Sequence, residues 1–257
     1  MFVNVICWGI LCFWALVQSV LAAEQLSIGT TVDVSHGNYG ATSATDLIAT
    51  TLQGKYTVDD FSVQINVPYL RLSGPSQITA VSDTALIVPM KNVQHRETEG
   101  IGDIVLGGLY NTFNNPELGI AVDVGFKLKI PTAQHQAGLG SGEPDETLQL
   151  YAYKSLANFT FMLAAGYKWV GQPVNNDYRN TINGSAGLIY QLSENVSLGT
   201  IFDVRQSIFA TLDDQIEVTL YGAYKLSNAW RAQLYLYKGC TETSPDIGLG
   251  SMLNYRF

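Results

Sequence analysis

Charged side chains recur at every second position within several apolar stretches of this sequence. Alternation with a period of two places them on one face of a β-strand, opposite a face of apolar side chains. Acidic and basic groups gathered on one face can line a water-filled passage and set which ions or polar solutes cross it. We therefore treat the following as candidate pore-lining residues: Asp103, Asp123, Lys127, Lys129, Lys168, Asp203, Arg205, Glu217 and Arg231.

Histidines offer a second kind of chemistry, because imidazole is a common metal ligand. His36, His95 and His135 all fall in expected loops on the same side of the molecule. Loop acids that could complete a site are Glu97, Glu99 and Asp145. No pair of these residues has the spacing of a known metal motif. We therefore expect solvated loop histidines, with neither a metal nor a cofactor.

A Ser–His–Asp relay is a third kind of chemistry, and it would make the protein a hydrolase. His135 neighbours Ser141 and Asp145 in sequence, and His36 follows Ser35. Neither arrangement forms a known catalytic motif. We therefore predict no catalytic residue and no enzymatic activity, and hydrolysis stays a minor alternative.

The run GLGSG at 138–142 resembles a phosphate-binding loop only in its glycines. It lacks the Lys-Ser or Lys-Thr pair that follows such a loop, and no helix is expected after it. The run therefore predicts a flexible loop between two strands.

The elements that carry these residues have the pattern of β-strands. Between Leu118 and Ile130 apolar residues alternate with Asp123, Lys127 and Lys129, and the final segment 247–257 alternates in the same way. We find no convincing helical periodicity after residue 23. Twelve strands are expected, at approximately 25–35, 45–56, 61–73, 101–113, 117–131, 146–156, 159–171, 181–192, 196–208, 213–226, 229–239 and 247–257.

Strand and loop lengths both favour a barrel that spans a membrane. Most expected strands have ten to fourteen residues, which is longer than most strands of soluble sheets and sufficient for a tilted membrane crossing. Short turns alternate with longer loops, as in outer-membrane barrels, whose short turns are periplasmic. A soluble lipocalin-like barrel is the less favoured alternative. The short turns are 57–60, 114–117, 155–158, 192–195 and 226–229, and the loops are 36–44, 74–100, 132–145, 172–180, 209–212 and 240–246.

Aromatic residues at the short-turn ends predict a girdle at the membrane interface. Its expected members are Tyr56, Phe61, Tyr110, Phe113, Tyr153, Phe159, Tyr190, Tyr224, Trp230, Tyr255 and Phe257. The final segment 247–257 is expected to pair with the first strand, because a barrel in lipid cannot leave an unpaired edge.

The first 23 residues are uncharged and mostly apolar, and they end in small residues. They predict a cleaved signal peptide (1–23) ahead of a barrel domain (24–257), with an uncleaved membrane helix as the alternative. A net charge of −8 argues against a nucleic-acid partner. After residue 23 only Cys240 remains, so no intrachain disulfide is expected.

Together these features predict an all-β, membrane-spanning, antiparallel up-and-down β-barrel of about twelve strands. We expect a monomer in the bacterial outer membrane, in contact with membrane lipid and small-molecule solutes.

Residues 74–100 form the longest expected loop and contain the apolar run ALIVPM at 85–90. Six consecutive apolar side chains would be unfavourable in a solvated loop. We therefore expect this segment to fold into the lumen or to line its mouth.

Three segments carry a resemblance to a known family: EGIGDIVLGGLYNTF (99–113), GFKLKIPTAQHQAGLGSGEPDETLQLYAYKSL (125–156) and AAGYKWVG (164–171). Their order is similar to that in outer-membrane channels of the MetA-pathway-of-phenol-degradation family. The resemblance implies a channel for passive uptake of small solutes, including aromatic or hydrophobic compounds. A structural or adhesive barrel is the alternative function, and an outer-membrane hydrolase is a less favoured one.

The basic candidates lead to a hypothesis about selectivity. Lys127, Lys129, Lys168 and Arg205 are expected in the outer half of the barrel, with Asp33 and Asp103 beside or across from them. These charges either pair with one another in a hydrated wall or create a transverse field that orients a passing acid solute. We expect joint replacement of the four basic residues by Ala to shift the reversal potential toward cation preference.

Overall fold

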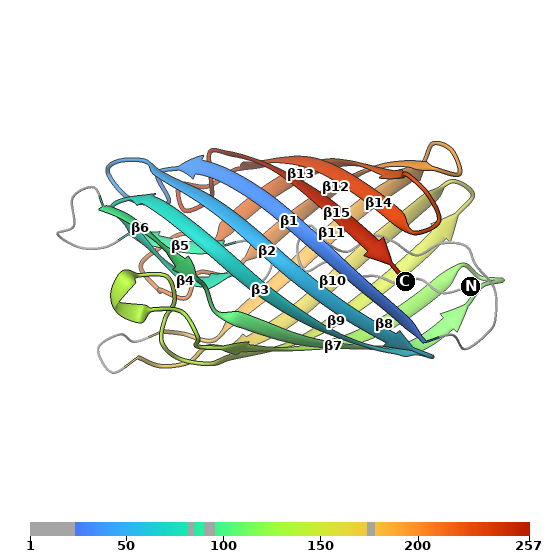
Figure 1. Cartoon of the computed structure of the whole chain (residues 1–257), viewed down its shortest axis with the longest axis horizontal. Coiled ribbons are helices and arrows are strands. Elements are labelled where there is room, and N and C mark those ends of the chain that lie inside the picture. The colour runs from blue at the N-terminus through green and yellow to red at the C-terminus, as the bar shows by residue number, and fades with distance from the viewer. Residues whose placement is uncertain (1–23, 82–84, 90–95, 174–177) are drawn as a thin grey trace.

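The computed structural model, described over residues 24–81, 85–89, 96–173 and 178–257, is a closed antiparallel β-barrel (Figure 1). The wall has twelve positions, because β6 and β7 both pair with β3 and together fill one of them. This confirms the predicted fold class. The strands are β1 (Gln25–Gly37), β2 (Thr45–Val58), β3 (Phe61–Gly74), β4 (Ser76–Val81), β5 (Ala85–Pro89), β6 (Arg96–Ile101), β7 (Ile104–Asn115), β8 (Ile120–Ile130), β9 (Asp145–Leu156), β10 (Phe159–Trp169), β11 (Thr181–Gln191), β12 (Val196–Arg205), β13 (Gln215–Lys225), β14 (Trp230–Gly239) and β15 (Ile247–Arg256).

The last strand closes the barrel against the first. β15 pairs antiparallel with β1, from Arg256 opposite Ser27 to Ile247 opposite His36. The backbone N–H of Phe257 donates to the carbonyl of Leu26 at 3.0 Å, which extends the seam to the end of the chain. The predicted closing role of 247–257 is confirmed, and closure gives the backbone groups of both edge strands partners within the sheet.

The fourth wall strand starts earlier than the expected 101–113 and is broken. Tyr69 of β3 pairs with Ile101 of β6, whereas Asn66 pairs with Val105 of β7. Between them lies Pro68, which has no backbone N–H to donate, and its carbonyl accepts from the N–H of Gly102 at 2.8 Å. The break between β6 and β7 therefore lies opposite the position where β3 lacks a backbone hydrogen-bond donor.

Other boundaries differ from expectation only at the rims. Four of the five short turns lie where the sequence predicts them, whereas the turn between β7 and β8 covers 116–119 rather than 114–117. The connection between β12 and β13 covers 206–214 rather than 209–212. His36 belongs to β1 rather than to the loop 36–44. The connection between β8 and β9 contains the short 3-10 helix η1 (His135–Ala137). The described residues include no helix that is both long and apolar enough to cross a membrane.

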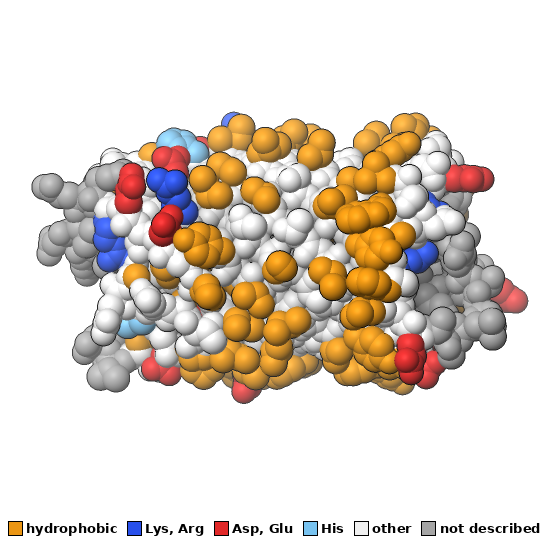
Figure 2. Space-filling model, viewed as in Figure 1, with side chains coloured by type: hydrophobic (Ala, Val, Ile, Leu, Met, Phe, Trp, Pro, Cys, Tyr) orange, Lys and Arg blue, Asp and Glu red, His pale blue; other side chains and the backbone are white. Residues whose placement is uncertain are grey.

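Polar and apolar faces are arranged opposite to those of a soluble barrel. On β3, Phe61, Val63 and Ile65 are exposed on the outside, while Gln64 and Asn66 are buried on the inside. On the face seen in Figure 2, hydrophobic side chains gather over the wall, and charged side chains lie mostly toward its two ends. An apolar outer band is the surface that lipid requires, so the soluble-barrel alternative is excluded.

The aromatic girdle is present, with one exception. Exposed members at the short-turn end include Phe61, Tyr110 and Trp230. Tyr153, which was expected in the girdle, is instead buried on the inner face with 3% exposure. It shares the face of Tyr151, two residues earlier on β9, so strand alternation directs it into the lumen.

The segment 74–100 folds inward where it is described. β4 and β5 form a hairpin in which Ile78 pairs with Ile87, and both side chains are buried. They belong to an apolar cluster, called here the outer cluster, with Tyr39, Leu47, Ala49, Leu70, Leu72 and Leu139. The predicted inward folding is confirmed for these residues, and the inner face of β2 and β3 is apolar beneath the hairpin.

Tyr39 joins the outer cluster to the wall. It lies beyond the end of β1, and its hydroxyl donates to Ser35 Oγ at 2.8 Å. Burial raises the pKa of the Tyr39 hydroxyl, so this group keeps its proton and remains a donor.

Candidate functional site

The inner face of the barrel carries all nine candidate charged residues. Six are buried and three are half-buried, and each lies among other inward-facing side chains. Whether they line a conducting pore stays a prediction. The buried residues are Asp103, Asp123, Lys127, Lys129, Asp203 and Glu217, and the half-buried ones are Lys168, Arg205 and Arg231.

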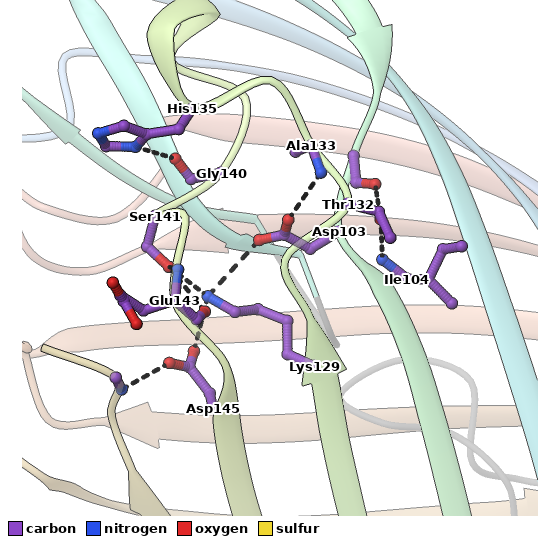
Figure 3. A network of polar contacts seen from close by, with 12 residues as sticks. Asp103, Ile104, Lys129, Thr132, Ala133, His135, Gly140, Ser141, Glu143 and Asp145 are labelled. Atoms are coloured by element: carbon purple, nitrogen blue, oxygen red, sulfur yellow. Dashed lines mark hydrogen bonds and ion pairs between the residues drawn. The ribbon is translucent and has the colours of Figure 1, made fainter. Parts of the chain in front are cut away.

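Lysines and carboxylates in the outer half form a network, called here the outer ion network (Figure 3). Lys129 Nζ lies 3.1 Å from Asp145 Oδ2 and 3.5 Å from Asp103 Oδ2, and it donates to Ser141 Oγ at 2.6 Å. Lys168 Nζ lies 2.9 Å from the same Asp145 oxygen. Two positive and two negative side chains therefore balance within the network, which offsets the cost of burying them.

Backbone groups complete the coordination of both carboxylates. Asp103 Oδ1 accepts from the N–H of Ala133 at 3.0 Å, and Asp145 Oδ1 accepts from the N–H of Gly171 at 3.0 Å. The Thr132 hydroxyl donates to the carbonyl of Gly102 at 2.9 Å. The loop after β8 is thereby fixed to the break between β6 and β7.

Three separate runs of the sequence meet in this network. GIGD (100–103) supplies Asp103, KIPT (129–132) supplies Lys129, and GLGSG (138–142) supplies Ser141. Gly140 lies so close to the break that a Cβ there would be 2.8 Å from the Asp103 carboxylate oxygens. The run 138–142 lies in a loop between two strands as predicted, but Ser141 is not solvated, because it is buried with 4% exposure and bonded to Lys129.

Further candidates have polar partners on neighbouring strands. Arg205 of β12 forms an ion pair with Glu217 of β13. Ser185 Oγ donates to Asp203 Oδ1 at 2.5 Å, and Asn111 Nδ2 donates to Asp123 Oδ1 at 2.5 Å. These contacts, of which the Asn111–Asp123 bond lies near the short-turn end, favour the pairing alternative over an unpaired transverse field.

Two tyrosines that the site prediction omitted bind Asp33, which the selectivity hypothesis placed near the basic residues. Tyr237 and Tyr235 on β14 donate to the two carboxylate oxygens of Asp33 on β1, at 2.7 and 3.0 Å, across the intervening β15. A Cβ at Gly248 or Gly250 of β15 would overlap these rings, so the glycines let the tyrosines lie across that strand. Alternation along each strand places Asp33 and the two tyrosines on the inner face. Only the strand register shows that the tyrosines reach Asp33.

A pocket lies at the short-turn end of the lumen. Its cationic lining residues are Lys55 of β2, Arg231 of β14 and Arg256 of β15, of which only Arg231 is among the predicted residues. The remaining lining is mostly amide, hydroxyl and small apolar groups: Gln25, Ser27, Gly29, Gln53, Thr57, Gln64, Ala229, Ala232, Met252 and Asn254. The inner-face position of Lys55 and Arg256 follows from alternation, and this signal could have identified them.

The described histidines make local polar contacts. His36 lies on the outer face with Nδ1 2.6 Å from Asp46 Oδ1, and both side chains are more than half exposed. His135 Nδ1 lies 3.1 Å from the carbonyl of Gly140. His95 lies outside the described residues. Within the described part of the chain, no group of three or more His, Cys, Asp or Glu side chains could hold a metal ion.

The two proposed relay arrangements are not assembled. Ser35 accepts from Tyr39 on the inner face, while His36 faces outward, because adjacent strand residues point to opposite sides. In the other arrangement Ser141 and Asp145 bond to Lys129, and His135 Nδ1 faces a backbone carbonyl. These serines and histidines do not form the nucleophile–base pair of a hydrolase.

Comparison with known proteins supports the barrel assignment. No curated protein matches the sequence. The structure resembles the COG4313 outer membrane channel from Pseudomonas putida F1, with a TM-score of 0.68 and 15% identity over 93% of this chain and 97% of that one. Weaker similarities are to the translocator domain of the autotransporter NalP from Neisseria meningitidis (TM-score 0.49, 12% identity, 91% and 88% coverage) and to the CymD monoaromatic hydrocarbon channel (TM-score 0.46, 12% identity, 92% and 88% coverage).

The closed barrel with its apolar outer wall is an outer-membrane protein of bacteria. Residues 27–257 match the family described as "Putative MetA-pathway of phenol degradation". The match includes the three segments whose side chains meet in the outer ion network. The chain belongs to the MetA-pathway-of-phenol-degradation family.

Proposed function

We propose that this barrel is a channel for passive uptake of small solutes across the outer membrane, including aromatic compounds. The observation that carries the proposal is the polar and charged inner face inside an apolar wall. The wall has twelve strand positions and is therefore wider than eight-stranded barrels, whose interior is filled by side chains. A Lys or Arg on the lipid face near the bilayer midplane would cost about 2–4 kcal/mol.

The solute class follows from the family and from the lumen chemistry. The family description refers to phenol degradation, so phenols and related aromatics are the first solutes to test. Five tyrosines and a methionine face the lumen in one cluster and can contact aromatic rings. These residues are Tyr151, Tyr153, Tyr221, Tyr235, Tyr237 and Met162.

In the proposed channel, a solute meets its tightest passage in the outer half of the lumen. The outer cluster and the outer ion network both occupy it, so a solute passes beside side chains that are held by packing and by ion pairs. Small solutes are therefore favoured over oligomers. The channel acts as a monomer and without catalysis, since the Ser and His contacts described above do not form a hydrolase relay.

The test is single-channel recording in planar bilayers, combined with solute flux into liposomes. We expect steady current and faster entry of phenol and benzoate than of a disaccharide of low membrane permeability. Empty liposomes correct for diffusion through the lipid. Absence of both current and protein-dependent flux in a folded barrel would overturn the proposal and favour a structural or adhesive barrel.

A further inference from the structure

A row of cations lies at the short-turn end of the lumen. Arg231 pairs in register with Asn254, two residues before Arg256 on β15. Arg256 and Lys55 both pair with Ser27, from opposite sides of β1. Lys225 continues the row, because it pairs with Arg231 from β13. The register thus brings positive side chains from β13, β14, β15 and β2 to one level of the barrel.

Acidic groups are scarce around this row. Of the described residues that line the pocket, none is Asp or Glu, although the whole chain has 22 acidic and 14 basic residues. Asp123 of β8 interacts electrostatically with Lys55, and its carboxylate also accepts from Asn111. Arg256 donates to the carbonyl of Asn228 at 3.2 Å, which anchors the side chain without neutralising it. The described lining of the pocket therefore contains three basic side chains and no acidic one.

Neutral groups around the cations would suit the rest of a small organic acid. Gln53, Gln64 and Asn254 provide amides that can donate to carboxylate oxygens. Met252 provides an apolar surface against which a ring or short chain can pack. Two guanidinium groups on neighbouring strands match the planar, two-oxygen geometry of a carboxylate.

We propose that this pocket is a binding site for the carboxylate of a small organic acid, held by Arg231 and Arg256 and assisted by Lys55. As a site for solutes in transit, it rests on the proposed channel function and gives that function a substrate class. The site lies on the periplasmic side of the outer ion network, so it receives anions that have already passed that network. Its positive potential raises the local concentration of such anions.

Binding is tested directly on the folded barrel in detergent by titration calorimetry, using sodium benzoate as the probe and benzamide as its neutral analogue. The test variant is R231Q/R256Q. The matched control is K154Q/K238Q, which removes the same charge from two exposed lysines on the outer face. We expect the test variant to bind benzoate at least about tenfold more weakly, because charge-assisted hydrogen bonds are lost. The control is expected to bind like the native protein.

A second variant, K55Q, tests the same site if R231Q/R256Q does not fold. K55Q leaves β14 and β15 intact, and it should also lower benzoate affinity. Heat-modifiable gel migration checks the fold of each variant. Equal benzoate affinity in a folded test variant and the native protein, or benzamide binding as tightly as benzoate, would overturn the site.

Conductance of the same samples separates this inference from the channel function. Current without benzoate binding leaves the channel proposal standing and removes the carboxylate site. Benzoate binding that depends on the arginines, but without current or flux, keeps the site and removes uptake.

Discussion

In the outer half of the lumen, Lys129 and Lys168 lie 3.1 and 2.9 Å from the same Asp145 carboxylate oxygen. In the periplasmic half, Arg231 and Arg256 line a pocket whose described residues include no acid. Balanced charges that are buried and bonded to backbone hold loops in place, whereas excess charge beside a pocket attracts a counter-ion. We therefore infer a structural role for the charges in the outer half of the lumen and a solute-binding role for those in the periplasmic half.

The largest effect is expected when Lys127, Lys129, Lys168 and Arg205 are replaced together by Ala. Asp103, Asp145 and Glu217 would then lose cations that compensate them, and the reversal potential should move toward cation preference. Bilayer recording in a salt gradient measures the shift, with gel migration as the check on folding. An unchanged reversal potential in a conducting barrel would exclude the outer charges as the filter and leave the segment 74–100 as the better candidate.

Lys129→Met alone tests the structural role of the outer ion network. Asp145 keeps Lys168, but Asp103 loses its lysine, so the free energy of unfolding should fall by about 3 kcal/mol. Urea unfolding in lipid vesicles, followed by tryptophan fluorescence, gives this value. Lys154→Met, on the exposed outer face, is the control and should change it little. Equal stabilities of the two variants would contradict a structural network.

Gly250→Ala tests the packing of the tyrosines that face Asp33. A Cβ at Gly250 would overlap the Tyr235 ring, so the free energy of unfolding should fall by about 1–3 kcal/mol. The displaced ring should also reduce conductance. Gly222→Ala on β13 is the control, because its nearest atom is an ordinary 3.5 Å contact with Leu198. Restoration of conductance in Gly250→Ala/Tyr235→Leu would locate the cause in the ring, and no restoration would argue against it.

The smallest effect is expected at the outer rim, where His36 and Asp46 form an exposed pair. His36→Ala should change the free energy of unfolding by less than about 1 kcal/mol, because solvent screens exposed ion pairs. Conductance and benzoate affinity should be unchanged. Loss of either would mean that the outer face contributes to transport, against the division drawn above.

Much of the fold follows from alternation in the sequence. The segment 118–130 places Asp123, Lys127 and Lys129 on one face, and the structure keeps all three on the inside of β8. The same rule should have directed Tyr153 inward, but its position near a short turn favoured the girdle. Alternation along a strand determines which face an aromatic residue occupies. A position close to a turn does not by itself place the residue on the outer face.

The sequence predicts which charged residues of the candidate site face inward, but it does not predict which side chains contact one another. Inward charges could be named individually, whereas the meeting of Asp103, Lys129 and Ser141 depends on a loop that folds back over the rim. The run 138–142 has the composition of a flexible loop, and its order comes from a lysine on β8. Side-chain partners across loops have no periodic signal in a single sequence.

The sequence by itself determined the strands, their two faces, the membrane-facing side and the closing role of 247–257, because these depend on a period of two and on the cost of unpaired edges in lipid. Tertiary structure alone decided the partners. Strand register brought Arg231, Arg256 and Lys55 to one level, and the break opposite Pro68 brought Asp103 to Lys129. Register and loop path are set by packing and hydrogen bonds between distant segments, so alternation along one strand cannot specify them.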